Sequence, residues 1–340
     1  MVVGVPIPVV IVAGYLGSGK TTLLNYLLRN NGGTRIGVVV NDFGAVNIDS
    51  MLVAGQVDSA ISLGNGCICC AVDVSDMDEL FARLAHPRSA IDVIVVEASG
   101  LAEPKNMIRL VLGSTNPHIT YGGLVEVVDA AEFESTRERH PEVDQHLRLA
   151  DLVVVNKVDA VAADKLSELI ASVRKVVGDV PILPTSEARV DPQLLFDPPE
   201  REVAAQLTLD QLLLEDDHAG EHRHLHDEYD SVSFTSVQSL DPRKLLDLLE
   251  NPPTGLFRAK GVVAFAVSGE RRKFVVHAVG RHIRVEPMRW SKGEERVSNL
   301  VLIGAGIDMD ALEGRLAGVV HSGDPLGDDA LLGLWRYVSA

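Results

Sequence analysis

The sequence predicts two domains: an α/β domain with a mostly parallel sheet, followed by a smaller α+β domain. Its 340 residues exceed what one compact core usually holds. Short β-branched apolar runs alternate with helical patterns through the first half. Near residue 190 the amino-acid composition changes, and a stretch rich in Pro, acidic residues and His begins. We therefore expect the α/β domain in residues 1–195, an acidic His-containing linker in 196–230 and the second domain in 231–340.

The elements of the first domain follow a regular order. The expected strands are PVVIVA, RIGVVVND, IDVIVVEAS, GLVEVVD, DLVVVNKVD and PILPTS. The expected helices are TTLLNYLLRN, MDELFARLA, VDQHLRLA and ADKLSELIASVRKVV. The strands show little apolar–polar alternation, which is typical of central strands in a parallel sheet covered on both faces.

The second domain is expected to hold an antiparallel sheet. Its strands are SVSFTSV, GVVAFAV, RKFVVHAV, HIRVEPM and NLVLIGAGI, and its helices are PRKLLDLLE and MDALEGRLAGVV. SVSFTSV alternates polar and apolar residues, as a strand with one buried face does.

Charge and composition exclude several classes of protein. The formal net charge of −17 argues against a nucleic-acid partner, which needs clustered Lys and Arg. No run of about 18 apolar residues predicts a membrane span. The apolar N-terminus carries no positive segment and runs into a glycine-rich loop, which favours a strand over a signal peptide. With only three cysteines, we expect a cytoplasmic protein with free thiols.

Residues 14–21 read GYLGSGKT and match the phosphate-loop pattern G-x-x-x-x-G-K-[ST], between a strand and a helix. Glycines let the backbone N–H groups turn toward phosphate oxygens, and the helix N-terminus favours anions. Lys20 would bridge the β- and γ-phosphates as a catalytic group, and Thr21 would ligate Mg²⁺. The expected nucleotide-binding residues are Gly14, Gly17, Ser18, Gly19, Lys20, Thr21 and Thr22.

Residues 156–159 read NKVD and follow the apolar run DLVVV. Asp159 would accept hydrogen bonds from guanine N1–H and the 2-amino group, a donor pair that adenine lacks. Asn156 would bond the guanine edge, and the Lys157 stem would cover the base. Ser186, in the loop after the next strand, is a further candidate contact. The pattern predicts specificity for guanine nucleotides.

Two strand-end acids are candidates for the chemistry. Glu97 ends the strand IDVIVVE, where P-loop proteins place an acid that holds Mg²⁺, and we assign it a catalytic role. Asp42 ends the strand RIGVVVND, where it either reaches the metal or the attacking water or serves as a structural cap. No glutamine stands at an obvious position to orient the water.

All three cysteines fall in the stretch GNGCICC, at Cys67, Cys69 and Cys70. Three thiolates suit Zn²⁺, Cu⁺ or Co²⁺, with an open fourth position. Cys67 and Cys70 also form C-x-x-C, which would fit a redox role. The third interpretation is small buried apolar side chains. The stretch lies between the phosphate loop and Glu97, the interval that holds the first switch in P-loop GTPases, and this favours the metal.

The motifs GYLGSGKTT, GNGCICC, EASGLAEP and NKVD, in this order, resemble those of the CobW-like metallochaperones, which are P-loop GTPases. The resemblance spans most of residues 8–190, and the strand-rich region 231–320 resembles the family's C-terminal domain. It implies that the three cysteines bind a transition metal, which a client protein receives. Family members serve zinc homeostasis, cobalt for cobalamin synthesis or nitrile hydratase. Some carry further acids where this chain has the apolar Val40 and Ala45, so auxiliary metal sites there are not expected.

The linker contains four histidines within an acidic stretch of sixteen residues. H-x-H-x-H spacing can bind Zn²⁺, Co²⁺ or Ni²⁺ through neutral imidazoles. A solvated linker with little metal affinity is the alternative. The histidines are His218, His222, His224 and His226, of which the last three are candidate auxiliary ligands.

These observations predict a Mg²⁺-dependent GTP hydrolase that binds GTP and GDP, carries Zn²⁺ or Co²⁺ and acts as a monomer or homodimer. GTP would draw the thiolates together, and hydrolysis would release the metal to a client. The alternative is a metal-sensing regulatory GTPase that docks a partner and turns over slowly. A redox-switched GTPase is a third hypothesis, which predicts a disulfide between Cys67 and Cys70.

Overall fold

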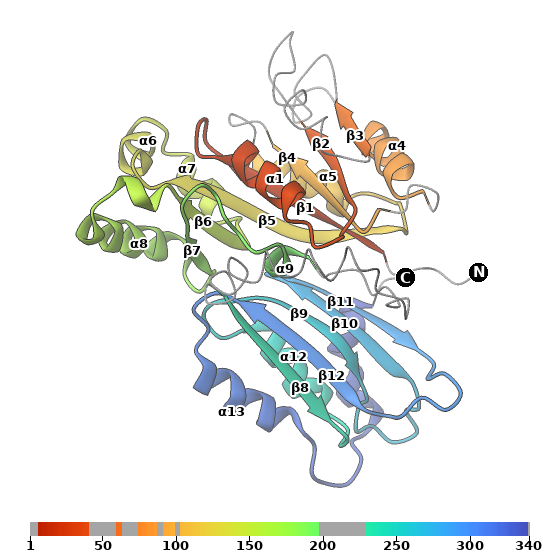
Figure 1. Ribbon diagram of the computed structural model, residues 1–340. Coiled ribbons are helices and arrows are strands. Elements are labelled where there is room, and N and C mark those ends of the chain that lie inside the picture. Colours follow the sequence, from red (N-terminus) through yellow and green to blue (C-terminus); the bar gives the residue numbers. More distant parts are fainter. Residues whose placement is uncertain are drawn as a thin grey trace, which may run out of the picture. The chain divides into compact units, whose positions relative to one another are not determined.

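The computed structural model describes residues 6–40, 59–62, 74–86, 91–98, 103–196 and 229–338. These residues belong to two compact units, in which residues 179–181 group with the C-terminal one. Figure 1 shows the two sheets, with the N-terminal unit in red to green and the C-terminal unit in green to blue. Each unit has its own hydrophobic core.

The sheet of the N-terminal unit is parallel at every pair of its described strands. Because the strands run in one direction, their carboxyl ends meet at one edge of the sheet, where ligands bind in open α/β folds. The spatial order is β3 (Ser59–Ser62), β2 (Ile36–Val40), β4 (Val93–Glu97), β1 (Ile7–Gly14), β5 (Ile119–Asp129), β6 (Leu152–Asn156) and β7 (Ile182–Pro184).

Helices cover this sheet. Ile11 of β1 shares a core with Phe81 of α4 and Met107 of α5, so these two helices pack on one face. Val10 and Val12, which point to the opposite face, are also fully buried. The described helices are α1 (Lys20–Arg29), α4 (Val74–Leu84), α5 (Pro104–Leu112), α6 (Phe133–Arg139), α7 (Val143–Leu147), α8 (Ala163–Val177) and α9 (Pro192–Leu195).

The C-terminal unit is an antiparallel sheet with helices packed on one face. Leu245 of α12 (Pro242–Glu250) and Leu312 of α13 (Met309–Val319) share a core with the sheet residue Phe274. The strand order is β11 (His282–Met288), β10 (Lys273–Val279), β9 (Leu256–Val263), β12 (Ser298–Gly304) and β8 (Asp230–Ser236). Short 3₁₀ turns lie at Asp328–Leu331 and Leu334–Tyr337.

The predicted fold class is confirmed: a parallel α/β unit precedes a smaller α+β unit. One strand was misplaced, because β9 runs over Leu256–Val263 rather than over 261–267. Among the described helices and strands, four were missed, namely β3, α5, α6 and α9. Within the described ranges, no helix combines the length and the apolar character that crossing a bilayer requires.

Candidate nucleotide-binding site

The phosphate loop connects β1 to α1 at the carboxyl edge of the parallel sheet. Gly14 and Gly19 have φ angles of +145° and +109°. A Cβ atom on Gly14 would lie 2.3 Å from the carbonyl oxygen of Val127, and one on Gly19 would lie 2.2 Å from Nδ2 of Asn156. Both the backbone conformation and the close neighbours therefore require glycine at these positions.

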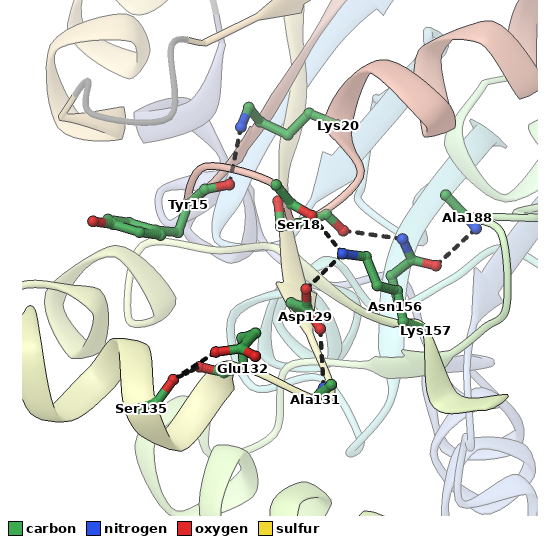
Figure 2. A network of polar contacts seen from close by, with 11 residues as sticks. Tyr15, Ser18, Lys20, Asp129, Ala131, Glu132, Ser135, Asn156, Lys157 and Ala188 are labelled. Carbon is green, nitrogen blue, oxygen red and sulfur yellow. Dashed lines mark hydrogen bonds and ion pairs between the residues drawn. The ribbon is translucent and has the colours of Figure 1, made fainter. Parts of the chain in front are cut away.

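The Lys20 ammonium lies over the loop. Its Nζ donates to the carbonyl oxygens of Gly14, at 2.9 Å, and Tyr15, at 3.1 Å. Figure 2 shows the bond to Tyr15. Lys20 is buried, so its charge is only weakly screened by water. This places a cation at the point where the pattern predicts the phosphates of a nucleotide.

Thr21 and Glu97 meet at the ends of two adjacent parallel strands. Thr21 is the second residue of α1, and Glu97 is the last residue of β4, which pairs with β1. The Thr21 Oγ1 donates to the Glu97 Oε1 at 2.8 Å, and Glu97 is only 4% exposed. A hydroxyl oxygen and a carboxylate oxygen are the hard donors that Mg²⁺ prefers. The two side chains therefore fit the predicted Mg²⁺ site, where the ion would neutralise charge on the phosphates.

The NKVD motif contacts the phosphate loop directly, as Figure 2 shows. The Asn156 Nδ2 donates to the carbonyl oxygen of Ser18 at 3.0 Å, and its Oδ1 accepts from the Ala188 N–H at 2.8 Å. Lys157, in the left-handed conformation with φ of +61°, donates from Nζ to the Gly17 carbonyl oxygen at 2.7 Å. Sequence reasoning assigned these residues to the base. The structure shows that both side chains bond the phosphate loop, and their role at the base stays a prediction.

The two loops predicted to reach the base lie side by side. The Val158 N–H donates to the Thr185 carbonyl oxygen at 3.3 Å, which joins the NKVD turn to the loop after β7. Asp159 is exposed in that turn, and Ser186 is half-buried in the second loop. Ser186 precedes two residues with positive φ, which are Glu187 and Ala188. Guanine recognition by Asp159 and Ser186 stays a prediction.

Sequence reasoning missed Asp129. This carboxylate ends β5, and its Oδ2 lies 2.6 Å from the Nζ of Lys157. Its Oδ1 accepts from the Ala131 N–H at 2.9 Å. An acid at the end of the apolar run GLVEVVD was a usable signal, because Glu97 was identified in the same way.

Tyr15 was also missed. Its hydroxyl lies 2.7 Å from the Nε2 of His140, and the two rings are 4.7 Å apart. The Nδ1 of His140 in turn lies 3.1 Å from Glu142 Oε1. These contacts hold the phosphate loop against the end of α6. No motif signals them, because 125 residues separate Tyr15 from His140.

Several predicted site residues lie outside the described part of the chain: Asp42, Cys67, Cys69, Cys70, His218, His222, His224 and His226. Their proposed roles stay predictions. Among the residues that the structure describes, no three His, Cys, Asp or Glu side chains gather as a metal-binding group.

Fold and site together define a P-loop GTPase, which uses GTP, GDP and Mg²⁺. Residues 8–184 match the family model described as "CobW/HypB/UreG, nucleotide-binding domain". Residues 229–320 match the "Cobalamin synthesis protein cobW C-terminal domain". The chain belongs to the CobW/HypB/UreG family.

Similar proteins cover nearly the whole chain. One is "Zinc chaperone CobW" of Pseudomonas aeruginosa, at 32% identity over 91% of this chain and 90% of that protein. Another is "Zinc chaperone CobW" of a Sinorhizobium species, at 29% identity over 92% and 96%. A solved structure of the Zn(II)-bound YjiA GTPase from E. coli covers 93% of this chain and 99% of that chain. Its sequence identity is 20% and its TM-score is 0.44.

Proposed function

We propose that this protein is a GTP-dependent zinc metallochaperone of the cytoplasm. It takes up Zn²⁺ on the thiolates of Cys67, Cys69 and Cys70 and passes it to a client protein. Support comes from the C-x-C-C stretch and from relatives named zinc chaperones that match this chain along nearly its full length.

The observation that carries the proposal is the alignment of three strand ends. Val40 of β2 pairs with Ser62 of β3 on one side and with Glu97 of β4 on the other. The chain thus leaves β3 at the edge that holds the Thr21–Glu97 pair, and Cys67 follows five residues later in the sequence. Loss of the γ-phosphate would act at this edge, and only five residues of sequence separate the end of β3 from Cys67.

The donor set favours zinc as the cargo. Thiolates bind borderline and soft cations, and three of them leave a fourth position for an acceptor's ligand. At most such sites Zn²⁺ binds more tightly than Co²⁺. An open site suits a metal that must leave again.

Zinc release to a colorimetric zinc chelator, followed during turnover, tests the function. Zinc-loaded protein is mixed with chelator and Mg²⁺, together with GTP, a non-hydrolysable GTP analogue or GDP. We expect slow release with the analogue and faster release as GTP is hydrolysed. The triple variant C67S/C69S/C70S should load no stoichiometric zinc while it still binds GTP. If the rate of zinc release is the same with and without GTP hydrolysis while the protein still binds a partner, the metal-sensing adaptor is favoured instead.

A further inference from the structure

Glu126 is a buried acid next to the phosphate loop that the nucleotide site does not use. It lies in β5, where it pairs with Ala13 of β1, the residue before the loop begins. Its side chain is 3% exposed, and among the described residues its Oε2 has no hydrogen-bond partner. An acid in this setting is costly in its ionised form, because burial removes the water that stabilises the charge.

A cavity of about 190 Å³ lies between Glu126, the phosphate loop and α6. The loop contributes Tyr15, Leu16 and Ser18 to its wall. Ser18 is 1% exposed, and its Oγ likewise has no hydrogen-bond partner among the described residues. Two buried polar atoms that have no hydrogen-bond partner in the described part of the chain therefore line one cavity, which is large enough for water to join them.

The charges around the cavity do not neutralise Glu126. The titratable groups that line the cavity with Glu126 are Tyr15 on the loop, Asp129 on its own strand, Glu132 just before α6 and Arg139 at the end of α6, and the charge of Lys20 also acts on Glu126. Arg139 donates to Ser135, and Lys20 donates to loop carbonyls. Burial raises the pKa of Glu126 to about 8, although the positive charge of Lys20 lowers it in part.

We propose that Glu126 is a positioning residue of the phosphate loop, which accepts a nucleoside triphosphate only while the Glu126 carboxyl group is neutral. The neutral carboxyl can donate a hydrogen bond to the Ser18 hydroxyl, directly or through water. This bond would stabilise the conformation of the phosphate loop. An ionised carboxylate would repel the phosphates through a poorly screened medium and would compete with them for the Lys20 ammonium.

Proton and nucleotide binding are then coupled in both directions. A bound triphosphate adds negative charge beside Glu126 and strengthens proton binding there. GTP affinity is therefore full well below pH 8 and falls as pH rises through 8. For one linked proton the dissociation constant weakens about tenfold between pH 7 and pH 9.

The test is the GTP dissociation constant measured from pH 7 to pH 9 for the wild type, E126Q and E132Q. Glu132 lies on the cavity wall and bonds Ser135 at the surface, so E132Q makes the same chemical change where no effect is expected (Figure 2). Ionisation of GTP itself affects all three proteins equally. We expect wild type and E132Q to lose about tenfold more affinity than E126Q across this range. Parallel profiles for wild type and E126Q would overturn the proposal.

Proton uptake gives a second measurement that needs no variant. Calorimetric titration of wild type with GTP at pH 8, in two buffers of different ionisation enthalpy, should show about half a proton taken up at Glu126. This uptake should fade toward pH 6.5 as the carboxyl becomes protonated before binding. If the proton uptake at pH 8 is no larger than the ionisation of GTP itself accounts for, the linkage is refuted. This result holds even if E126Q fails to fold.

Discussion

Replacing Asn156 with alanine separates its role in holding the phosphate loop from its role at the base. The side chain is 2% exposed and makes two hydrogen bonds, to the Ser18 carbonyl and from the Ala188 N–H. Each contributes about 0.5–1.5 kcal/mol net, so the pair is worth about 1–3 kcal/mol. If the nucleotide must order the phosphate loop on binding because these two bonds are gone, the affinity for the nucleotide falls by about 5- to 150-fold.

Fluorescent GDP and inorganic triphosphate are the two probes for this variant. A residue that braces the loop affects both ligands, whereas one that only reads guanine affects GDP alone. We expect N156A to weaken both.

The matched control is N30A. Asn30 donates from Nδ2 to the Tyr26 carbonyl oxygen at the far end of α1, so the same substitution is made away from the loop. Its affinities should stay within about twofold of wild type, since helix-end contacts are worth only about 1 kcal/mol and do not touch the ligand. Unchanged triphosphate binding in N156A would refute the bracing role.

Two further substitutions test other parts of the site. T21V removes the hydroxyl that bonds Glu97, so Mg²⁺-dependent GTP hydrolysis should fall at least 100-fold in a phosphate-release assay; activity within tenfold of wild type would contradict the Mg²⁺ assignment. G19A adds strain of about 1–2 kcal/mol at φ +109° and drives a Cβ atom into Asn156, so GTP binding should be lost in calorimetry. G32A carries similar strain at φ +58° with open space around it, so it should bind GTP normally.

Much of the fold could be predicted from the sequence because the local sequence pattern of its main elements agrees with the structure that they form. β4 is a run of buried β-branched residues, and α8 has a long amphipathic repeat. Not every missed element carries a weak signal, because α5 has an amphipathic pattern and begins with Pro104, and it could have been predicted. The signals of β3 and α6 are weaker. β3 has four residues, two of them serine, and α6 spans only seven. Their placement depends on tertiary packing against neighbouring elements, which no local pattern encodes.

The candidate site likewise has residues that the sequence predicts and others that it does not. The phosphate loop and the Thr21–Glu97 pair follow from motifs, because their chemistry fixes residue types at set spacings. Glu126 carried no such signal. It reads as one polar residue within an apolar strand, and only the strand register brings it beside Ala13 and the loop.

The most direct test of the account is the Zn²⁺ dissociation constant of the protein with Mg²⁺ and either a non-hydrolysable GTP analogue or GDP. Competition with a zinc indicator would measure it, with C67S/C69S/C70S as the control for other sites. We expect tighter zinc binding with the GTP analogue, by about 5- to 150-fold as is typical of allosteric coupling. The difference between the two nucleotide states should disappear in the triple variant. Equal zinc affinity in the two nucleotide states would contradict the claim that GTP controls the metal.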